Sequence, residues 1–359
     1  MDPFEPVRQV SDRAARAPTK LAQLPLRTRQ LARAEPGQTP YTVVHEEPLV
    51  DLRRYEPAAV DATERRAPIM IVYPFINDPS ILDFRPERSV IRGFLERGFP
   101  VYVLEWTDAS PLDRSRGLDD VVGRTLARCV AFARRDADAE AVHLLGYSTG
   151  APLAAAYAGL YSDTVRTLTL QGAPLDFDAG GSVGQLRSIA RRLDLEQVAE
   201  TFDVVPASFL EAGFVLRKPV EYAITNPLRL WDRFDDDEYV EDVARKLAWT
   251  VDGPAIPAAF FREFVRRLLV ENRLVREELC VNGRTVALED VSMPVLLVVG
   301  RDDAFVPPEA SVPFLDVIGS EDTEVREFPT GHVGLSTAPD VHDADGGWPS
   351  VRDWLVARE

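Results

Sequence analysis

The sequence predicts a mostly parallel α/β sheet that is flanked by helices and interrupted by an inserted, mainly helical region. Three observations support this prediction. Short apolar runs alternate with amphipathic segments between Pro68 and Pro174, the alternation then stops, and it resumes with the apolar run at residues 295–299. Continuous apolar runs are typical of strands that are covered on both faces, as in parallel sheets.

Each expected strand is a short apolar run, and each expected helix repeats its apolar residues every three or four positions. The expected strands are residues 41–52, 69–73, 101–104, 142–145, 165–170, 295–299 and 324–328. The expected helices are residues 89–97, 118–135, 151–160, 311–318 and 350–358. The first strand differs from the others, because its apolar and polar residues alternate as in a strand with one exposed face. Gly98 directly after the first helix is a typical helix stop.

These elements divide the chain into three parts. Residues 1–40 are rich in Arg, Pro and Ala and are expected to form an N-terminal arm. Residues 41–175 and 289–359 form the predicted core. Residues 176–288 carry helical patterns rich in charged and aromatic residues, and we interpret them as a helical cap.

The composition excludes several classes of function. Asp and Glu number 58 against 41 Lys and Arg, which gives a formal net charge of −17. Such a surface repels phosphate backbones, so we expect no nucleic-acid binding. The only lysines are Lys20, Lys218 and Lys246, and an acidic, lysine-poor surface suits a salt-rich, halophilic cytoplasm.

Targeting and metal signals are absent from the sequence. No stretch approaches the ~20 apolar residues of a membrane span. Residues 1–30 are Arg-rich without the apolar run of a secretory signal, so we expect a cytoplasmic protein. Cys129 and Cys280 lie far apart, which predicts small residues in or near the core and neither a disulfide framework nor a metal site.

The segment Gly146-Tyr147-Ser148-Thr149-Gly150 follows a predicted buried strand and precedes a predicted helix. This is the context of a nucleophile elbow and predicts the α/β-hydrolase fold. The flanking positions must be small, because strand and helix pass close to each other there. The turn would lift the Ser148 hydroxyl clear of the sheet and direct the Thr149 backbone N–H at a developing oxyanion.

A serine nucleophile needs a histidine base, and the chain has four histidines. His332 follows the last predicted strand, where this fold delivers its base, and we predict that it fills that role. His45 lies in the first strand, His143 lies inside a buried strand, and His342 lies in an acidic segment that we expect to be an exposed loop.

The carboxylate that orients the base is expected after the strand at 295–299. Asp303 has the usual spacing and is preferred, with Asp302 as the alternative. The order Ser148, Asp303, His332 is that of α/β-hydrolases. The second oxyanion donor should be the backbone N–H of Ile76 or Phe75, in the loop after the strand at 69–73, and the residues do not choose between them.

Several segments together resemble the catalytic subunit of class III polyhydroxyalkanoate synthases, collinearly over residues 45–358 including the cap. They are residues 68–73, 81–84, 86–89, 101–106, 118–120, 165–166, 174–177, 306–308, 328–329 and 331–334. By position, the resemblance implies that Ser148 is the nucleophile, Asp303 the carboxylate and His332 the base. The sequence departs from the family twice: the cysteine nucleophile of the family is Ser148 here, and the histidine that follows its aspartate is Ala304.

The resemblance implies acyl transfer from (R)-3-hydroxyacyl-CoA through a covalent acyl intermediate. It also implies a second synthase subunit and a location at polyester granules. CoA would enter as part of the substrate, so no bound cofactor is expected. The sequence is compatible with a homo-oligomer.

Two other functions stay open. The serine favours an esterase, a thioesterase or a polyhydroxyalkanoate depolymerase, because an acyl-serine is an oxygen ester that lies close in energy to the polyester and is open to water. A non-catalytic, granule-associated paralogue is the third hypothesis, against which the intact Ser-Asp-His set argues.

Overall fold

The computed structural model describes residues 20, 23–29, 31, 37, 39–56, 66–210, 225–250, 253–343 and 346–359. The chain divides into two compact units. The larger contains residues 37–207 and 253–359, and the smaller contains residues 1–36 and 208–252.

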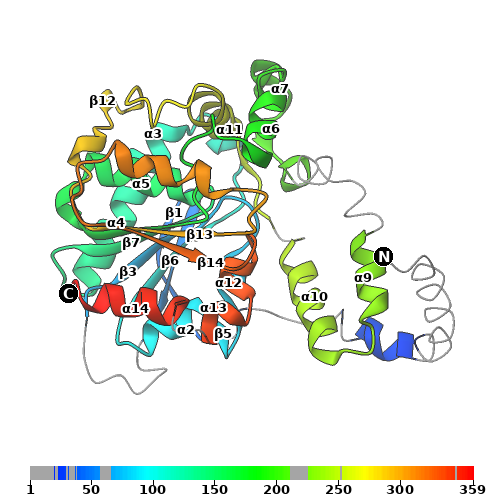
Figure 1. Ribbon diagram of the computed structural model, residues 1–359. Coiled ribbons are helices and arrows are strands. Elements are labelled where there is room, and N and C mark those ends of the chain that lie inside the picture. Colours follow the sequence, from blue (N-terminus) through cyan, green and yellow to red (C-terminus); the bar gives the residue numbers. More distant parts are fainter. Residues whose placement is uncertain are drawn as a thin grey trace. The chain divides into compact units, whose positions relative to one another are not determined.

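The larger unit is built on an eight-stranded sheet with the order β1-β2-β6-β3-β7-β8-β13-β14 (Figure 1). The strands are β1 (Thr42–Glu47), β2 (Val50–Tyr55), β3 (Ile69–Val72), β6 (Val101–Trp106), β7 (Val142–Tyr147), β8 (Val165–Gln171), β13 (Val295–Gly300) and β14 (Thr323–Phe328). All neighbours from β6 to β14 pair in parallel, whereas β2 is antiparallel to both β1 and β6. The predicted mostly parallel sheet is confirmed.

Helices cover both faces of this sheet (Figure 1). On one side lie α2 (Val90–Leu95) and α14 (Trp348–Val356), and on the other lie α3 (Leu118–Asp120), the π-helical segment η4 (Val121–Leu126), α4 (Ala127–Asp136) and α5 (Gly150–Leu160). The helix predicted over 118–135 is therefore continuous through three segments. Ser89 caps α2, since its hydroxyl accepts a hydrogen bond from the Arg92 N–H at 2.9 Å.

Two predicted elements differ in the structure. Residues 41–52 were predicted as one strand, but the chain reverses at Pro48 and Leu49, so β1 and β2 form an antiparallel pair. Proline cannot donate to a ladder, and the alternating pattern on both sides of it belongs to two strands. Residues 311–318 contain the short 3-10 helix η10 (Val312–Asp316), with Pro313 in its first turn, instead of an α-helix.

The inserted region is mainly helical, as predicted. Its predicted boundaries, residues 176 and 288, differ from the boundaries between the two units. The helices α6 (Gly181–Ala190), α7 (Leu195–Thr201), α11 (Ala258–Glu263) and the π-helical segment η7 (Phe264–Val270) belong to the larger unit. The helices α9 (Asn226–Asp232) and α10 (Asp237–Thr250) belong to the smaller unit.

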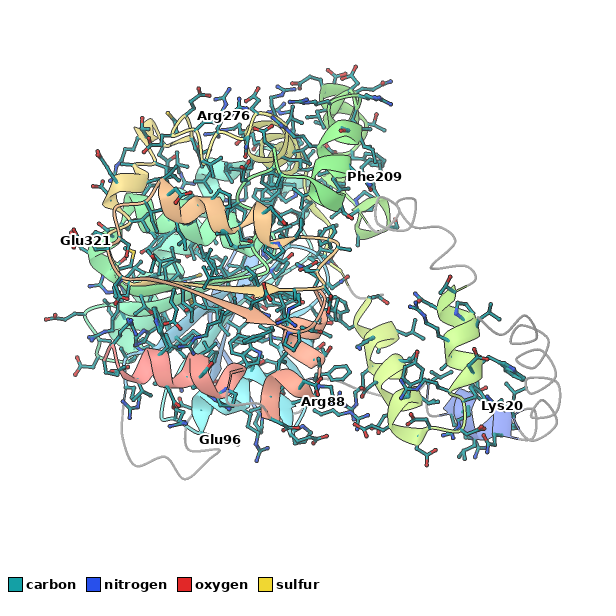
Figure 2. The ribbon with its side chains drawn as sticks, in the orientation of Figure 1. Lys20, Arg88, Glu96, Phe209, Arg276 and Glu321 are labelled. Atoms are coloured by element: carbon teal, nitrogen blue, oxygen red, sulfur yellow. The ribbon has the colours of Figure 1, made fainter. Side chains whose placement is uncertain are left out.

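The smaller unit contains residues from both the predicted arm and the predicted cap. Lys20 is almost fully buried there (Figure 2), and its ammonium donates to the carbonyls of Trp231 and Asp232 at the end of α9. Arg27, also buried, pairs with Asp237 at the start of α10. Residues from the predicted arm therefore pack with residues from the predicted cap. Much of 1–40 lies outside the described residues, as do 211–224 and 251–252. Within the described segments, no helix has both the length and the apolarity of a membrane span.

Candidate active site

Ser148 stands at the turn between β7 and α5. Its φ angle is +48°, a left-handed conformation that costs a non-glycine residue about 1–3 kcal/mol. Two backbone hydrogen bonds hold the turn: the Ser148 N–H donates to the Gln171 carbonyl, and the Ser148 carbonyl accepts from Ala151, both at 2.9 Å. The turn therefore has the strained geometry of a nucleophile elbow.

The two glycines of the elbow have no room for a side chain. A Cβ at Gly146 would lie 2.6 Å from the Ala151 Cα, and a Cβ at Gly150 would lie 2.1 Å from the Val72 oxygen. Both contacts are with backbone atoms, which cannot rotate away. The close passage of strand and helix that the sequence predicted is present in the structure.

The predicted base and carboxylate meet at Ser148. The His332 Nε2 lies 2.9 Å from the Ser148 Oγ, and the His332 Nδ1 lies 2.7 Å from the Asp303 Oδ2. With Asp303 ionised, the Nδ1–H donates to its carboxylate and leaves the Nε2 as acceptor for the serine proton. The sequence separation between Ser148 and His332 is 184 residues, so the fold alone assembles this set.

The carboxylate is fixed on its other side as well. The Asp303 side chain has no exposed surface, and its Oδ1 accepts from the N–H groups of Phe305 and Val306, each at 2.9 Å. Asp302, the alternative carboxylate, is exposed, and the carboxylate hydrogen-bonded to the His332 Nδ1 is that of Asp303. Of the two aspartates, the structure therefore brings only Asp303 to His332.

Three neighbours that sequence reasoning missed hold the imidazole of His332. The Tyr147 ring stacks on it with centroids 5.8 Å apart, and the edge of Phe305 meets it at 5.0 Å. Gly172, with a φ of +52°, lies beneath it, and a Cβ there would be 3.0 Å from the His332 Cε1. A glycine directly after a buried strand was the only sequence signal for this contact.

The predicted oxyanion donors lie in two loops. Thr149 is the N-cap of α5, where backbone N–H groups have no partner within the helix. The second loop starts beside the elbow, and the Trp106 Nε1 donates to its Tyr73 carbonyl at 3.0 Å. Phe75 is buried in this loop and Ile76 is partly exposed. That one of their backbone N–H groups is the second oxyanion donor stays a prediction.

The other three histidines make polar contacts elsewhere in the structure. His143 is buried between Thr167 and Glu359, at 2.8 and 3.0 Å, and burial lowers its pKa. His45 pairs with Glu47. The expectation that His342 lies in an exposed loop was wrong, since it is buried on α13 (Asp340–Asp343) and its Nε2 lies 2.8 Å from the Ser336 carbonyl.

The cysteines and possible metal ligands complete the survey of reactive groups. Cys129 is buried, which raises the pKa of its thiol to about 12. Cys280 is exposed, so the expectation of a position in or near the core was wrong for it. Among the described residues, no group of three or more His, Cys, Asp or Glu side chains could hold a metal ion.

Comparison with known proteins identifies the family. The alpha/beta hydrolase fold family model matches residues 79–339, and the model of the poly-beta-hydroxybutyrate polymerase (PhaC) N-terminus matches residues 32–94. The poly(3-hydroxyalkanoate) polymerase subunit PhaC of Haloferax mediterranei is 39% identical over 322 residues, which are 90% of this chain and 65% of that protein. The same subunit of Haloarcula marismortui is 38% identical over 327 residues, 90% of this chain and 68% of that protein. The chain belongs to the PhaC family.

This PhaC-family chain spans about two thirds of the length of those two relatives. Their source organisms fit the salt-rich habitat predicted from the composition. A thermophilic esterase from Thermogutta terrifontis matches with a TM-score of 0.50 and 18% identity, over 90% of this chain and 99% of that one, and this likeness concerns the fold alone. The predicted α/β-hydrolase fold and the predicted family are both confirmed.

Proposed function

We propose that this PhaC-family chain is a polyhydroxyalkanoate synthase-like acyltransferase that takes (R)-3-hydroxyacyl groups from CoA through a covalent acyl-Ser148 intermediate. The observation that carries the proposal is the hydrogen-bonded set of Ser148, His332 and Asp303 in a chain of this family. An intact nucleophile, base and carboxylate have no use in a non-catalytic granule protein.

In the first half-reaction, the Ser148 Oγ attacks the thioester carbonyl while the His332 Nε2 accepts its proton. The oxyanion lies against the Thr149 N–H and a second backbone N–H from the loop with Phe75 and Ile76. When the tetrahedral adduct collapses, the C–S bond breaks and His332 returns the proton to the leaving sulfur, which releases CoA. Asp303 holds the Nδ1–H and stabilises the imidazolium throughout.

In the second half-reaction, the hydroxyl of a chain end or of another 3-hydroxyacyl group attacks the acyl-serine. Its proton passes to the His332 Nε2 and then to the Ser148 Oγ, so the new ester forms as the enzyme is restored. Loading from a thioester onto serine runs downhill, whereas transfer from one oxygen ester to another is nearly level. Water is therefore a serious competitor at this step, and the serine favours hydrolysis as the second candidate function.

The inserted residues of the larger unit support transfer over hydrolysis, because they contact both loops that flank the site. Gly181 at the start of α6 packs against Pro307, which follows the carboxylate loop. Phe75 packs edge to face on Phe260 and Phe264, with centroids 5.2 and 4.9 Å apart. We propose that these residues act as the cap that limits the access of water to the acyl-serine.

The remaining assignments rest on the family. The relatives are named as subunits, which supports a second synthase subunit as partner, and a cytoplasmic location at polyester granules follows from the proposed product. CoA enters as part of the substrate, and no bound cofactor is proposed.

The decisive experiment incubates the purified protein with (R)-3-hydroxybutyryl-CoA, with and without a candidate second subunit. CoA release and the product are followed together. Polymer supports the synthase function, and free acid as the sole product refutes it in favour of a thioesterase. Cleavage of a simple ester without CoA release indicates an esterase. The Ser148→Ala variant should lose every activity, and a wild-type protein that a fluorophosphonate probe fails to label on Ser148 would indicate the non-catalytic paralogue.

A further inference from the structure

A single helical turn, α12 (Gly334–Thr337), directly follows the loop that carries His332. Four buried side chains from other parts of the larger unit hydrogen-bond to this turn. The contacts are Trp348 Nε1 to the Leu335 carbonyl at 2.8 Å, His342 Nε2 to the Ser336 carbonyl at 2.8 Å, Arg88 Nη1 to the Thr337 carbonyl at 3.0 Å, and Gln171 Nε2 to the Ser336 Oγ at 2.8 Å. Of these four residues, Arg88 is labelled in Figure 2. The segment that carries the base is thus fixed from behind.

Gln171 differs from the other three because it also contacts the nucleophile turn. It is fully buried and is the last residue of β8, where its carbonyl accepts the Ser148 N–H at 2.9 Å. The next residue, Gly172, lies under the imidazole of His332. One residue therefore holds the backbone of the nucleophile with its main chain and the helix behind the base with its side chain.

The acceptor of the Gln171 amide lies close to His332 along the chain. Ser336 is a fully buried residue of α12, the turn that directly follows the loop with His332. The Gln171 amide thus fixes the position of a residue in the segment that carries the base.

The amide is not optimised for stability. Its Oε1 is buried and has no hydrogen-bond partner in the part of the chain that the structure describes. An unpaired buried acceptor is destabilising, so an apolar side chain of the same length would suit this position better if folding were the only demand.

We propose that Gln171 is a positioning residue that fixes the separation of Ser148 and His332 through its hydrogen bond to Ser336. This inference rests on the proposed role of Ser148 as nucleophile. It predicts that the loss of the amide slows the chemistry without weakening the fold.

The test replaces Gln171 by Met, which keeps the length of the side chain and removes the donor. The matched control is Thr169→Val, which also replaces a buried polar side chain of the same strand by an apolar one. The Thr169 hydroxyl has no hydrogen-bond partner among the described residues. The measurements are the rate of Ser148 labelling by a fluorophosphonate, kcat and KM on an activated ester per titrated active site, and the thermal midpoint. Because a misplacement of the order of 1 Å costs up to about a hundredfold, Gln171→Met should lower the labelling rate and kcat about 10- to 100-fold. KM and the midpoint should stay unchanged, as should all values for Thr169→Val.

If the probe labels the wild type and the Gln171→Met variant at the same rate, this inference is overturned and the proposed function stands. The same holds if the variant loses rate only in proportion to a lower thermal midpoint or a smaller fraction of active sites. An unlabelled wild type overturns the proposed function and this inference with it. The Ser336→Ala variant provides a second, independent test, because it removes the same hydrogen bond from the other side. The double variant should then lose no more rate than either single one, and fully additive losses would contradict the proposed link.

Discussion

The glycine that closes the elbow gives the sharpest quantitative prediction. The change is Gly150→Ala, which adds one methyl group at the first turn of α5. Its Cβ would lie 2.1 Å from the Val72 oxygen and 2.9 Å from the Val72 carbon. Both atoms belong to the backbone of β3, so no side chain can move aside.

The magnitude follows from these distances. A carbon normally approaches a carbonyl oxygen to about 3.3 Å, so α5 and the end of β3 must separate by about 1.2 Å. Only the N-cap residue Thr149 separates Ser148 from α5, so Ser148 should move with the helix. A misplacement of about 1 Å costs about a hundredfold in rate, or roughly 2.7 kcal/mol of barrier. Overpacking of this kind also costs about 1–3 kcal/mol of folding free energy.

The assay separates these two costs. Turnover of an activated ester is expressed per titrated active site, and the unfolding free energy is taken from a urea titration. The control is Gly346→Ala, where an added Cβ meets no atom within 4 Å, and it should match the wild type in both measurements. A Gly150→Ala protein with wild-type stability and a rate within about threefold of the wild type would refute the close-passage argument.

The carboxylate, the nucleophile and the buried histidines give three further predictions. Asp303→Asn should lower kcat about 10⁴-fold, because it removes the charge that holds the base in its tautomer, while Asp302→Asn at the exposed neighbouring position should leave kcat unchanged; equal effects would contradict the assignment. Ser148→Cys should raise the ratio of polymer to free acid formed from (R)-3-hydroxybutyryl-CoA, because an acyl-cysteine retains the thioester energy, and free acid as its only product would count against the synthase function. Burial lowers the pKa of His143 and of His342 below the ordinary value of 6.5, so their contribution to stability is complete above about pH 6.5 and is lost as the pH falls toward the folded-state values. Urea midpoints at about pH 8 and about pH 5.5 should therefore differ in favour of the higher pH, and equal midpoints would exclude this effect.

The three residues predicted for the site lie together in the structure, and each was predicted from a local pattern placed after a strand. The carboxyl ends of parallel strands meet at one edge of a sheet. A serine after β7, an aspartate after β13 and a histidine after β14 must then come together once the strands are recognised. The same reasoning placed the oxyanion loop after β3.

The contacts that support this site were beyond local patterns. Gln171 and Ser336 are 165 residues apart, and Lys20 and Trp231 are 211 residues apart, so neither pairing leaves a mark in its neighbourhood. His342 was misjudged for a related reason. Its acidic neighbours Asp340 and Asp343 suggested an exposed loop, but the carbonyl of Ser336 and the packing of α13 on α14 draw the ring inward.

Because the nucleophile is Ser148 and not a cysteine, the rest of the site must prevent hydrolysis of the acyl-enzyme if polymer is to form. With a cysteine, the energy of the thioester is kept until the hydroxyl acceptor arrives, and transfer to it is downhill. With a serine, that energy is released at loading, and the acyl-enzyme and the polyester lie at nearly the same level. The outcome then depends on whether water or the hydroxyl acceptor attacks the acyl carbonyl first. The proposed cap, and not the nucleophile, would therefore decide between hydrolysis and polymer formation. Phe75, in the predicted oxyanion loop, packs on Phe260 and Phe264 of the proposed cap. Under the proposed function, the control of water access would therefore lie next to the group that activates the ester.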